Sequence, residues 1–284
     1  MLHQGFYLTV ELSRTMVRYE HLDYYEEERT AVITFDRPEQ MNTLHKPMIS
    51  ELESAVTRAE SNEENRAVVL RGSEDAFSAG YDLDDDDTDE REYSVSEWLD
   101  AMESYTHIKT IYELDLPVIA AVDGYALAGG ANTALICDLT ISTKRAKIGY
   151  PDVRMGGLPA TLVHPFVMGS IKHARELFYS GKMVSGEEAA RMGMVNRCVP
   201  HDELIDEVWT EIEALRKTPK PVVTILKHRL NDVMEVQGYR PGNKNTEFLA
   251  SLTSLTEEGQ RFYEIQEEDG FDAALDWMHG ENKP

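Results

Sequence analysis

Three short, almost uninterrupted apolar stretches in the first half of the chain restrict its fold more than any other feature. They run from Thr30 to Phe35, from Ala67 to Gly72 and from Pro117 to Gly124. Strands of this composition are usually buried on both faces of a parallel sheet, and helices must then cover those faces. Apolar residues recur at helical spacing in residues 47–61 and again in residues 130–137, which supplies such helices. The sequence therefore predicts an α/β fold with mostly parallel strand pairing.

Beyond about residue 200 the strand-like pattern gives way to helices. Residues 202–217 and 221–236 have the spacing of long amphipathic helices, and the remaining tail also looks helical. We therefore divide the chain into an α/β part, residues 1–200, and a helical C-terminal part, residues 201–284. The apolar faces of the second part are expected to be buried between subunits.

The charge balance is strongly acidic, with 28 Lys and Arg against 52 Asp and Glu and a net charge of −24. Nucleic acids and anionic membranes bind clustered cations, so this balance argues against both as partners. Such a charge destabilises a compact chain by self-repulsion, which molar salt mostly screens because the Debye length falls to about 3 Å. The composition favours a cytoplasm that accumulates salt, and the alternative is an acidic enzyme from an ordinary cell.

The two cysteines, Cys137 and Cys198, are far apart and form no CxxC pair, as expected of a reduced protein. No apolar stretch reaches the roughly 18 residues that would cross a bilayer. The N-terminus shows no basic region followed by an apolar run, so no secretory signal is visible. We therefore expect a cytoplasmic protein.

An acidic segment after Leu83 invites comparison with a calcium-binding loop, because Asp82, Asp84 and Asp86 occupy alternate positions. An EF-hand loop also requires glycine at its sixth position and glutamate at its twelfth. This chain has Asp87 and Tyr93 there. We therefore predict no metal site, and expect a solvated, mobile insertion.

Two glycine-containing turns, residues 76–83 and residues 124–131, each follow an apolar strand. Glycine lets the backbone approach a ligand closely, and the helix that begins after the second turn presents unpaired N–H groups. Two such groups that converge on one thioester oxygen would form an oxyanion hole, and each would stabilise a transition state by about 3–4 kcal/mol. Taken singly, each turn is more often a packing feature. Motifs typical of dinucleotide, phosphate-loop, serine-hydrolase and zincin sites are absent from the sequence.

Together with three further segments, the turns resemble the crotonase superfamily, the enoyl-CoA hydratase/isomerase enzymes. The resemblance extends from about Tyr24 to the C-terminus. The matching segments, in chain order, are residues 37–44 (RP…NAL), 76–83 (AFxAGxDL), 117–138 (KPVIAAVxGxAxGGGxxLALxCDxxIA), 149–152 ((F/Y)GxPE) and 174–200 (A…L…G…(I/V)xAxEAxxxGLVxxVVP).

This resemblance implies a spiral of repeated ββα units with a helical C-terminal trimerisation region. It also implies an acyl-CoA substrate, with coenzyme A as part of the substrate and no separate cofactor. The assembly would be a homotrimer, or a hexamer made of two trimers.

The resemblance also implies roles for individual residues. The oxyanion-hole amides would belong to Tyr81 and Gly129. Coenzyme A would contact five residues around the turns, of which Asp82 would be mainly a structural cap: Leu44, Ser78, Gly80, Asp82 and Gly130.

The chain departs from the family pattern at its two glutamates. Asn132 occupies the position of the first and Asp152 that of the second. Asparagine can orient a water but is not a base, whereas Asp152 can act as acid or base with an arm one methylene shorter. The resemblance thus predicts a site with one carboxylate, at Asp152, assisted by Asn132.

Several reactions stay open with this site. Hydration and double-bond isomerisation both fit a single carboxylate. Hydrolysis of a thioester or carbon–carbon bond would need Asp152 with a histidine, for which His45, His107 and His164 are candidates. A non-catalytic acyl-CoA binding protein is the third class.

The acyl group itself is not identified by the sequence. The insertion of residues 84–112 brings Trp98, Tyr105 and Tyr112, which would either line a pocket for a bulky acyl chain or pack against the body of the protein.

Overall fold

The computed structural model of the protein describes residues 15–73, 75–83, 106–159, 161–244, 246–253 and 256–280. The predictions about the acidic segment, Trp98 and Tyr105 lie outside the described residues.

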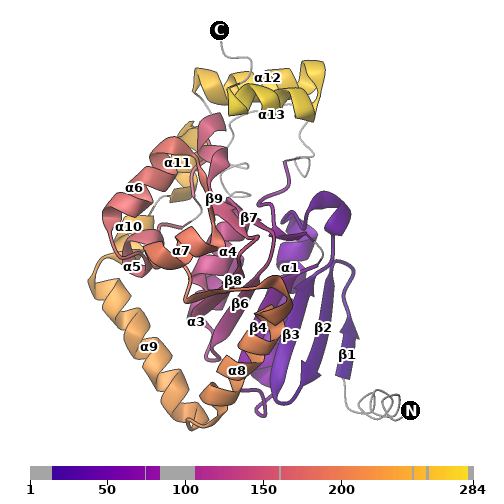
Figure 1. The fold of residues 1–284 in the computed structure, drawn as a ribbon, viewed down its shortest axis with the longest axis vertical. Helices are drawn as coiled ribbons and strands as arrows, with labels where there is room; N and C mark the ends of the chain where they lie inside the picture. The colour runs from indigo at the N-terminus through magenta and orange to yellow at the C-terminus, as the bar shows by residue number, and fades with distance from the viewer. Residues whose placement is uncertain are drawn as a thin grey trace.

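A large sheet of seven strands forms the centre of the α/β part (Figure 1). Its strands, in spatial order, are β1 (Thr15–Arg18), β2 (Leu22–Glu27), β3 (Thr30–Phe35), β4 (Ala67–Gly72), β6 (Val118–Val122), β8 (Leu139–Thr143) and β11 (Arg197–Val199). From β3 to β11 all neighbours are parallel, and β1 and β2 extend the sheet in antiparallel fashion. The three apolar stretches are the adjacent strands β3, β4 and β6, and every residue of β3 and β6 is buried. The predicted parallel α/β sheet is therefore confirmed.

A second sheet has four short strands, in the order β10 (Met183–Ser185), β9 (Lys147–Gly149), β7 (Tyr125–Leu127) and β5 (Ala76–Ser78). The chain alternates between the sheets, because β4 is followed by β5, β6 by β7 and β8 by β9. Helix α3 (Thr106–Glu113) follows the first pair and α4 (Gly129–Ile136) the second. This repetition is the predicted spiral of ββα units.

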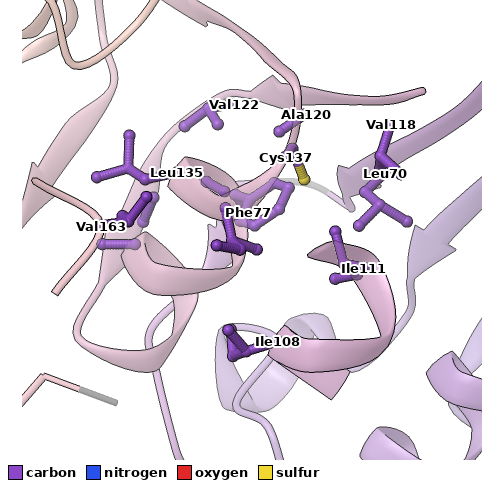
Figure 2. Packing of buried hydrophobic residues seen from close by; sticks show 14 of the residues in the cluster. Leu70, Phe77, Ile108, Ile111, Val118, Ala120, Val122, Leu135, Cys137 and Val163 are labelled. Carbon is purple, nitrogen blue, oxygen red and sulfur yellow. The ribbon is translucent and has the colours of Figure 1, made fainter. Parts of the chain in front are cut away.

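The main core lies between the sheets and the helices α1 (Lys46–Ser61), α3 and α4. Burial of each large apolar side chain there stabilises the fold by about 1.5–3 kcal/mol. Figure 2 shows part of this core, in which side chains from β4, β5, β6, α3 and α4 meet: Leu70, Phe77, Ile108, Ile111, Val118, Ala120, Val122 and Leu135.

Between β9 and β11 the chain forms four helical segments, most of which the sequence did not indicate. They are η2 (Pro151–Met155), α5 (His164–Val167), α6 (Ile171–Ser180) and α7 (Gly186–Met192). Ser185 caps α7 through a reciprocal bond with Glu188, which satisfies two of the helix's unpaired donors.

After β11 the described chain is helical, as predicted. The helices are α8 (Leu204–Arg216), preceded by the short turn η3 (His201–Glu203), then α9 (Lys220–Val236), α10 (Tyr239–Asn243), α11 (Thr246–Thr253), α12 (Glu257–Asp269) and α13 (Phe271–His279). In Figure 1, α9 runs along one side of the molecule, and α12 and α13 lie together at the end where the C-terminus emerges. The division into domains near residue 200 stays a prediction, although strands do give way to helices there.

Helices α8 and α9 are attached to the sheet region in different ways. Leu204, Val208 and Ile212 of α8 pack in a second apolar cluster against the large sheet. The ammonium group of Lys227 on α9 is buried and lies 2.8 Å from Asp138 Oδ2, and it also donates to two backbone carbonyls. None of the described helices is long and apolar enough to cross a membrane.

Candidate active site

Three segments of the predicted site follow three neighbouring parallel strands of the small sheet. The turn after β5 holds residues 79–83, the turn after β7 leads into α4, and the turn after β9 leads into η2. Strand β7 pairs in parallel with both β5 and β9, so all three turns leave the same edge of the sheet. Ligands commonly bind outside the carboxyl ends of parallel strands, and this edge is the candidate active site.

The turn after β5 is held by a short parallel bridge between Leu44 and Tyr81. The N–H of Leu44 donates to Gly80 O at 2.7 Å, and the N–H of Asp82 donates to Leu44 O at 3.0 Å. In such a bridge the backbone groups alternate in direction, so the N–H of Tyr81 points away from Leu44.

The turn after β7 lies directly against the first. Ala128 has φ 48° and ψ −117°, and its N–H donates to Gly149 O at 2.9 Å. A side-chain carbon on Gly80 would lie 3.0 Å from Ala128 Cβ and 3.4 Å from Gly129 N. Non-glycine residues rarely adopt a positive φ, and strain of this kind clusters at functional sites. The structure thus brings the segments of the two predicted oxyanion amides, Tyr81 and Gly129, into contact.

Asp82 fixes the first turn to the segment before α1. Its Oδ2 accepts hydrogen bonds of 3.0 Å from both terminal nitrogens of Arg37 and from the hydroxyl of Thr43. Paired, charge-assisted bonds of this type are strong and geometrically specific. The arrangement agrees with the structural role expected for Asp82.

The other predicted coenzyme A residues lie behind the turns. Leu44 and Ser78 are almost completely buried, and the hydroxyl of Ser78 accepts a bond from Gly80 N at 3.2 Å. A side-chain carbon on Gly130 would overlap the carbonyl oxygen of Ser78, so only glycine allows this packing. Contact of these residues with coenzyme A stays a prediction that concerns backbone groups more than side chains.

A cavity of about 570 Å³ opens beside the turns and extends beneath the C-terminal helices. Its volume and mostly apolar lining are typical of a small-molecule site. Residues from the first turn, η2 and the loop after it, β10 and α13 line it, among them Ala79, Tyr81, Leu83, Asp152, Met155, Leu158, Met183, Phe271, Leu275 and Met278. The sequence did not predict the contribution of α13, whose only signal was its apolar spacing.

Asp152 is the one carboxylate among the described residues that line this cavity. The residue is half-buried, and its Oδ1 atom is buried without a hydrogen-bond partner among the described residues. Desolvation raises the pKa of Asp152 to about 7. Hydrogen bonds from its own N–H and from that of Val153 lower the pKa, but by less than desolvation raises it. A carboxyl group that titrates near neutral pH is suited to acid–base catalysis.

Asn132 lies one helical turn after Gly129 and is 1% exposed. Its Oδ1 accepts a hydrogen bond of 3.0 Å from the hydroxyl of Tyr150, a residue that sequence reasoning missed although it lies in a matched segment. His164 Nε2 lies 2.6 Å from the same hydroxyl. The position expected for a glutamate is thus occupied by a buried, hydrogen-bonded amide.

None of the three candidate histidines hydrogen-bonds Asp152 in the described part of the chain. His45 Nδ1 lies 2.9 Å from Arg37, His107 Nε2 lies 3.0 Å from Thr133, and His164 bonds Tyr150. The Asp–His pair that hydrolysis would need is not among these contacts.

Tyr112 does not line the cavity. Its hydroxyl lies 3.2 Å from both Asn231 O and Glu235 Oε1, which share its one proton, and its ring lies 4.9 Å from that of Tyr239. The alternative expectation, packing against the body of the protein, is therefore confirmed for Tyr112.

Comparison with known proteins places the chain in a family. A family model described as enoyl-CoA hydratase/isomerase matches residues 26–269. The chain is 33% identical over 228 residues to a crotonyl-CoA hydratase of Syntrophomonas wolfei, covering 76% of this chain and 84% of that protein. It is 30% identical over 220 residues to a probable enoyl-CoA hydratase of Rhizobium meliloti, covering 77% and 84%.

The fold is also shared with solved structures. The crystal structure of an enoyl-CoA hydratase/isomerase from Xanthobacter autotrophicus Py2 superimposes with a TM-score of 0.86 at 30% identity, covering 94% of this chain and 100% of that one. An enoyl-CoA hydratase from Mycobacterium smegmatis superimposes with a TM-score of 0.85 at 25% identity, covering 92% and 94%. The chain belongs to the enoyl-CoA hydratase/isomerase family of the crotonase superfamily and is an enzyme that acts on acyl-CoA thioesters.

Proposed function

We propose that the protein adds water to 2-enoyl-CoA thioesters and that Asp152 is the acid–base residue of the reaction. The observation that carries this proposal is the Asp152 carboxyl, which lies on the cavity wall with a pKa near 7. A group that is half ionised at neutral pH both accepts and returns a proton readily.

In the proposed reaction the thioester oxygen lies against the N–H groups of Tyr81 and Gly129. The oxygen of water bonds to C3, one proton of that water passes to the Asp152 carboxylate, and the electrons of the double bond move to the thioester oxygen. Each N–H stabilises the resulting enolate by about 3–4 kcal/mol. The enolate then takes the proton from Asp152 at C2, which gives a 3-hydroxyacyl-CoA and returns the carboxylate.

The proposed reaction requires no cofactor other than the coenzyme A of the substrate. We assign its binding to the segments around the two turns, with contacts at Leu44, Ser78, Gly80, Asp82 and Gly130. The apolar lining of the cavity favours a hydrocarbon acyl chain over a charged one.

Isomerisation of the acyl double bond is the second candidate, and Asn132 favours it. The amide that replaces the first glutamate is not a base, so Asp152 is the one carboxylate among the described lining residues that can move protons. One carboxylate is sufficient for isomerisation, because the proton taken from one carbon can be returned to another while the enolate is held.

The outer face of α9 supports the proposal of a homotrimer or hexamer. Six apolar side chains at helical spacing are 45% to 90% exposed there: Val222, Ile225, Leu226, Leu230, Val233 and Val236. Contiguous exposed apolar surface of this kind is typical of subunit interfaces. The acidic composition supports a cytoplasmic protein adapted to high salt, with no nucleic-acid or membrane partner.

The test is incubation with crotonyl-CoA in molar KCl, following loss of the conjugated thioester absorbance and identifying products by mass. A gain of one water supports hydration, and formation of the 3-enoyl-CoA isomer without a mass change supports isomerisation. Release of free CoA thiol would contradict both candidates.

A further inference from the structure

A buried chain of three polar side chains lies next to the cavity wall. Asn132 is on α4, Tyr150 connects β9 to η2, and His164 begins α5. The hydroxyl of Tyr150 lies 3.0 Å from Asn132 Oδ1 and 2.6 Å from His164 Nε2, and none of the three residues is more than 1% exposed. A hydroxyl has one proton, so it donates one of these bonds and accepts the other.

Two arrangements of protons satisfy this condition. In the first, His164 Nε2–H donates to Tyr150, and Tyr150 donates to the carbonyl oxygen of Asn132. The amide N–H₂ of Asn132 and the bare Nδ1 of His164 then have no partner among the described residues. In the second, the amide is reversed and donates to Tyr150, Tyr150 donates to Nε2, and the proton of His164 is on Nδ1.

The surroundings of His164 favour the first arrangement. Its ring is fully buried and packs edge-on against Tyr150 at 4.8 Å and Phe178 at 4.7 Å. Each arrangement leaves two N–H groups unpaired, but in the first both belong to the Asn132 amide, where a bound water can accept from them, whereas in the second one of them is Nδ1–H of a ring enclosed by Tyr150 and Phe178. Burial lowers the pKa of His164 to about 3, so the ring is neutral and carries a single proton.

Tyr150 stays protonated in either arrangement, because burial and the nearby Asp152 raise its pKa well above the ordinary value. The hydrogen-bond donor of this network that has no partner among the described residues is then the N–H₂ group of Asn132. Asn132 does not itself line the cavity, but its backbone N–H donates to Ala128 O at 3.0 Å, and Ala128 and Asp152, two residues after Tyr150, both line the cavity.

We infer that Tyr150 and His164 are positioning residues that hold the Asn132 amide with its N–H₂ group as a hydrogen-bond donor toward the reacting water. This role rests on the proposed hydration and specifies how the reacting water is oriented. The amide binds one lone pair of the water oxygen, one water proton points to Asp152, and the second lone pair is left for C3. Asn132 therefore orients the water and takes no proton.

A double-mutant cycle tests whether Tyr150 acts through Asn132. Tyr150→Phe keeps the ring and removes the hydroxyl, and is expected to lower kcat about tenfold with KM within about twofold, the usual effect of one lost hydrogen bond. In an Asn132→Ala background the same change should have no further effect. An equal loss in both backgrounds would show a structural role, and a Tyr150→Phe enzyme at the wild-type rate would overturn the inference.

A matched pair of substitutions tests His164. The amide nitrogen of Gln reaches about the position of Nε2, whereas that of Asn reaches only Nδ1. His164→Gln should keep kcat within about threefold, and His164→Asn should lower it about tenfold. Phe178→Leu changes the packing of both rings without touching a hydrogen bond and is the control, with kcat expected within about twofold. Equal rates for the Gln and Asn variants would contradict the inference.

A measurement on the free protein separates this inference from the proposed reaction. ¹⁵N NMR should show His164 protonated on Nε2 and unchanged between pH 5 and pH 9. A proton on Nδ1 would overturn the inference whatever the substrate is. The expected spectrum together with no turnover of any enoyl-CoA would overturn the proposed function alone.

Discussion

The two sheets differ in strand length, in burial and in the role of the turns at their strand ends. The central strands of the large sheet have five or six residues, and β3 and β6 are buried throughout. Each strand of the small sheet has three residues, and its carboxyl-end turns place Tyr81, Gly129 and Asp152 together. Core strands of this kind stabilise a fold through burial, whereas the short strands mainly fix the directions in which the turns leave. We therefore expect changes in the small sheet to affect turnover first and changes in the large sheet to affect stability first.

The largest effect is expected at the end of β9. Asp152→Asn removes the only proposed acid–base group and should lower kcat roughly 10³-fold with the fold intact, as is usual for loss of such a group. Steady-state kinetics and circular dichroism check this outcome. Asp272→Asn, an exposed change on α13, is the control and should be neutral. A variant as active as the wild type would remove Asp152 from the mechanism.

The reverse behaviour is expected in the large sheet. Leu70→Ala leaves a cavity in the core shown in Figure 2 and should lower the free energy of unfolding by about 2–5 kcal/mol, with kcat unchanged in the folded protein. Urea denaturation measures the loss. Ile205→Ala, at an exposed position of α8, should cost far less. A fall in kcat as large as that of Asp152→Asn would break the contrast between the sheets.

Separation of the two turns should give an intermediate result. Gly130→Ala places a carbon on the carbonyl oxygen of Ser78, so α4 must move away from the end of β5. We expect kcat to fall about 10²-fold, the usual cost of one displaced oxyanion donor. Gly242→Ala, where nothing lies within 4 Å, is the matched control. Unchanged kcat in Gly130→Ala would show that the contact between the turns does not matter.

The smallest effect concerns pH. The pKa of Asp152 is about 7 in the folded protein and 3.8 by its ordinary value, so the unfolded chain loses this proton first as pH rises. The contribution of Asp152 to the free energy of unfolding therefore falls between about pH 4 and pH 7. The fraction of Asp152 that is ionised, and can act as the base in hydration, increases near pH 7. Because the residue is only half-buried, Asp152→Asn should be more stable than the wild type by about 1–3 kcal/mol at pH 8. Thermal unfolding at pH 8 and pH 4 checks this, and a difference that does not shrink at pH 4 would contradict it.

The difference in strand length between the two sheets also decided which strands could be predicted from the sequence. Residues 30–35 and 67–72 coincide with β3 and β4, because long apolar strands have an unambiguous pattern. Strands β5 and β7 have three residues each, which is too few to show an alternating pattern, and the sequence indicates only turns at residues 76–83 and 124–131. Helix α5 has only four residues, too few for a helical repeat, whereas α6 has ten residues and an amphipathic pattern from which it could have been predicted.

The residues of the site also differ in whether the sequence could predict them. The segments of Asp152 and Asn132 were found through short motifs, which depend on local order along the chain. The bond of Tyr150 to Asn132 joins a loop to a helix 18 residues away, and no spacing rule marks such a contact. The cavity wall formed by α13 depends on how the C-terminal helices fold back, which tertiary packing decides.

The ring of Tyr81 over Gly129 has a consequence for how this site can change during evolution. A methyl group on Gly129 would lie 2.5 Å from a carbon of that ring, so alanine at position 129 is incompatible with the present position of Tyr81. If position 81 first becomes small, alanine at position 129 becomes tolerable. The reverse order passes through a clash beside the reacting thioester. Only one of the two mutational paths between these sequences is therefore open to a lineage that must keep its activity at every step.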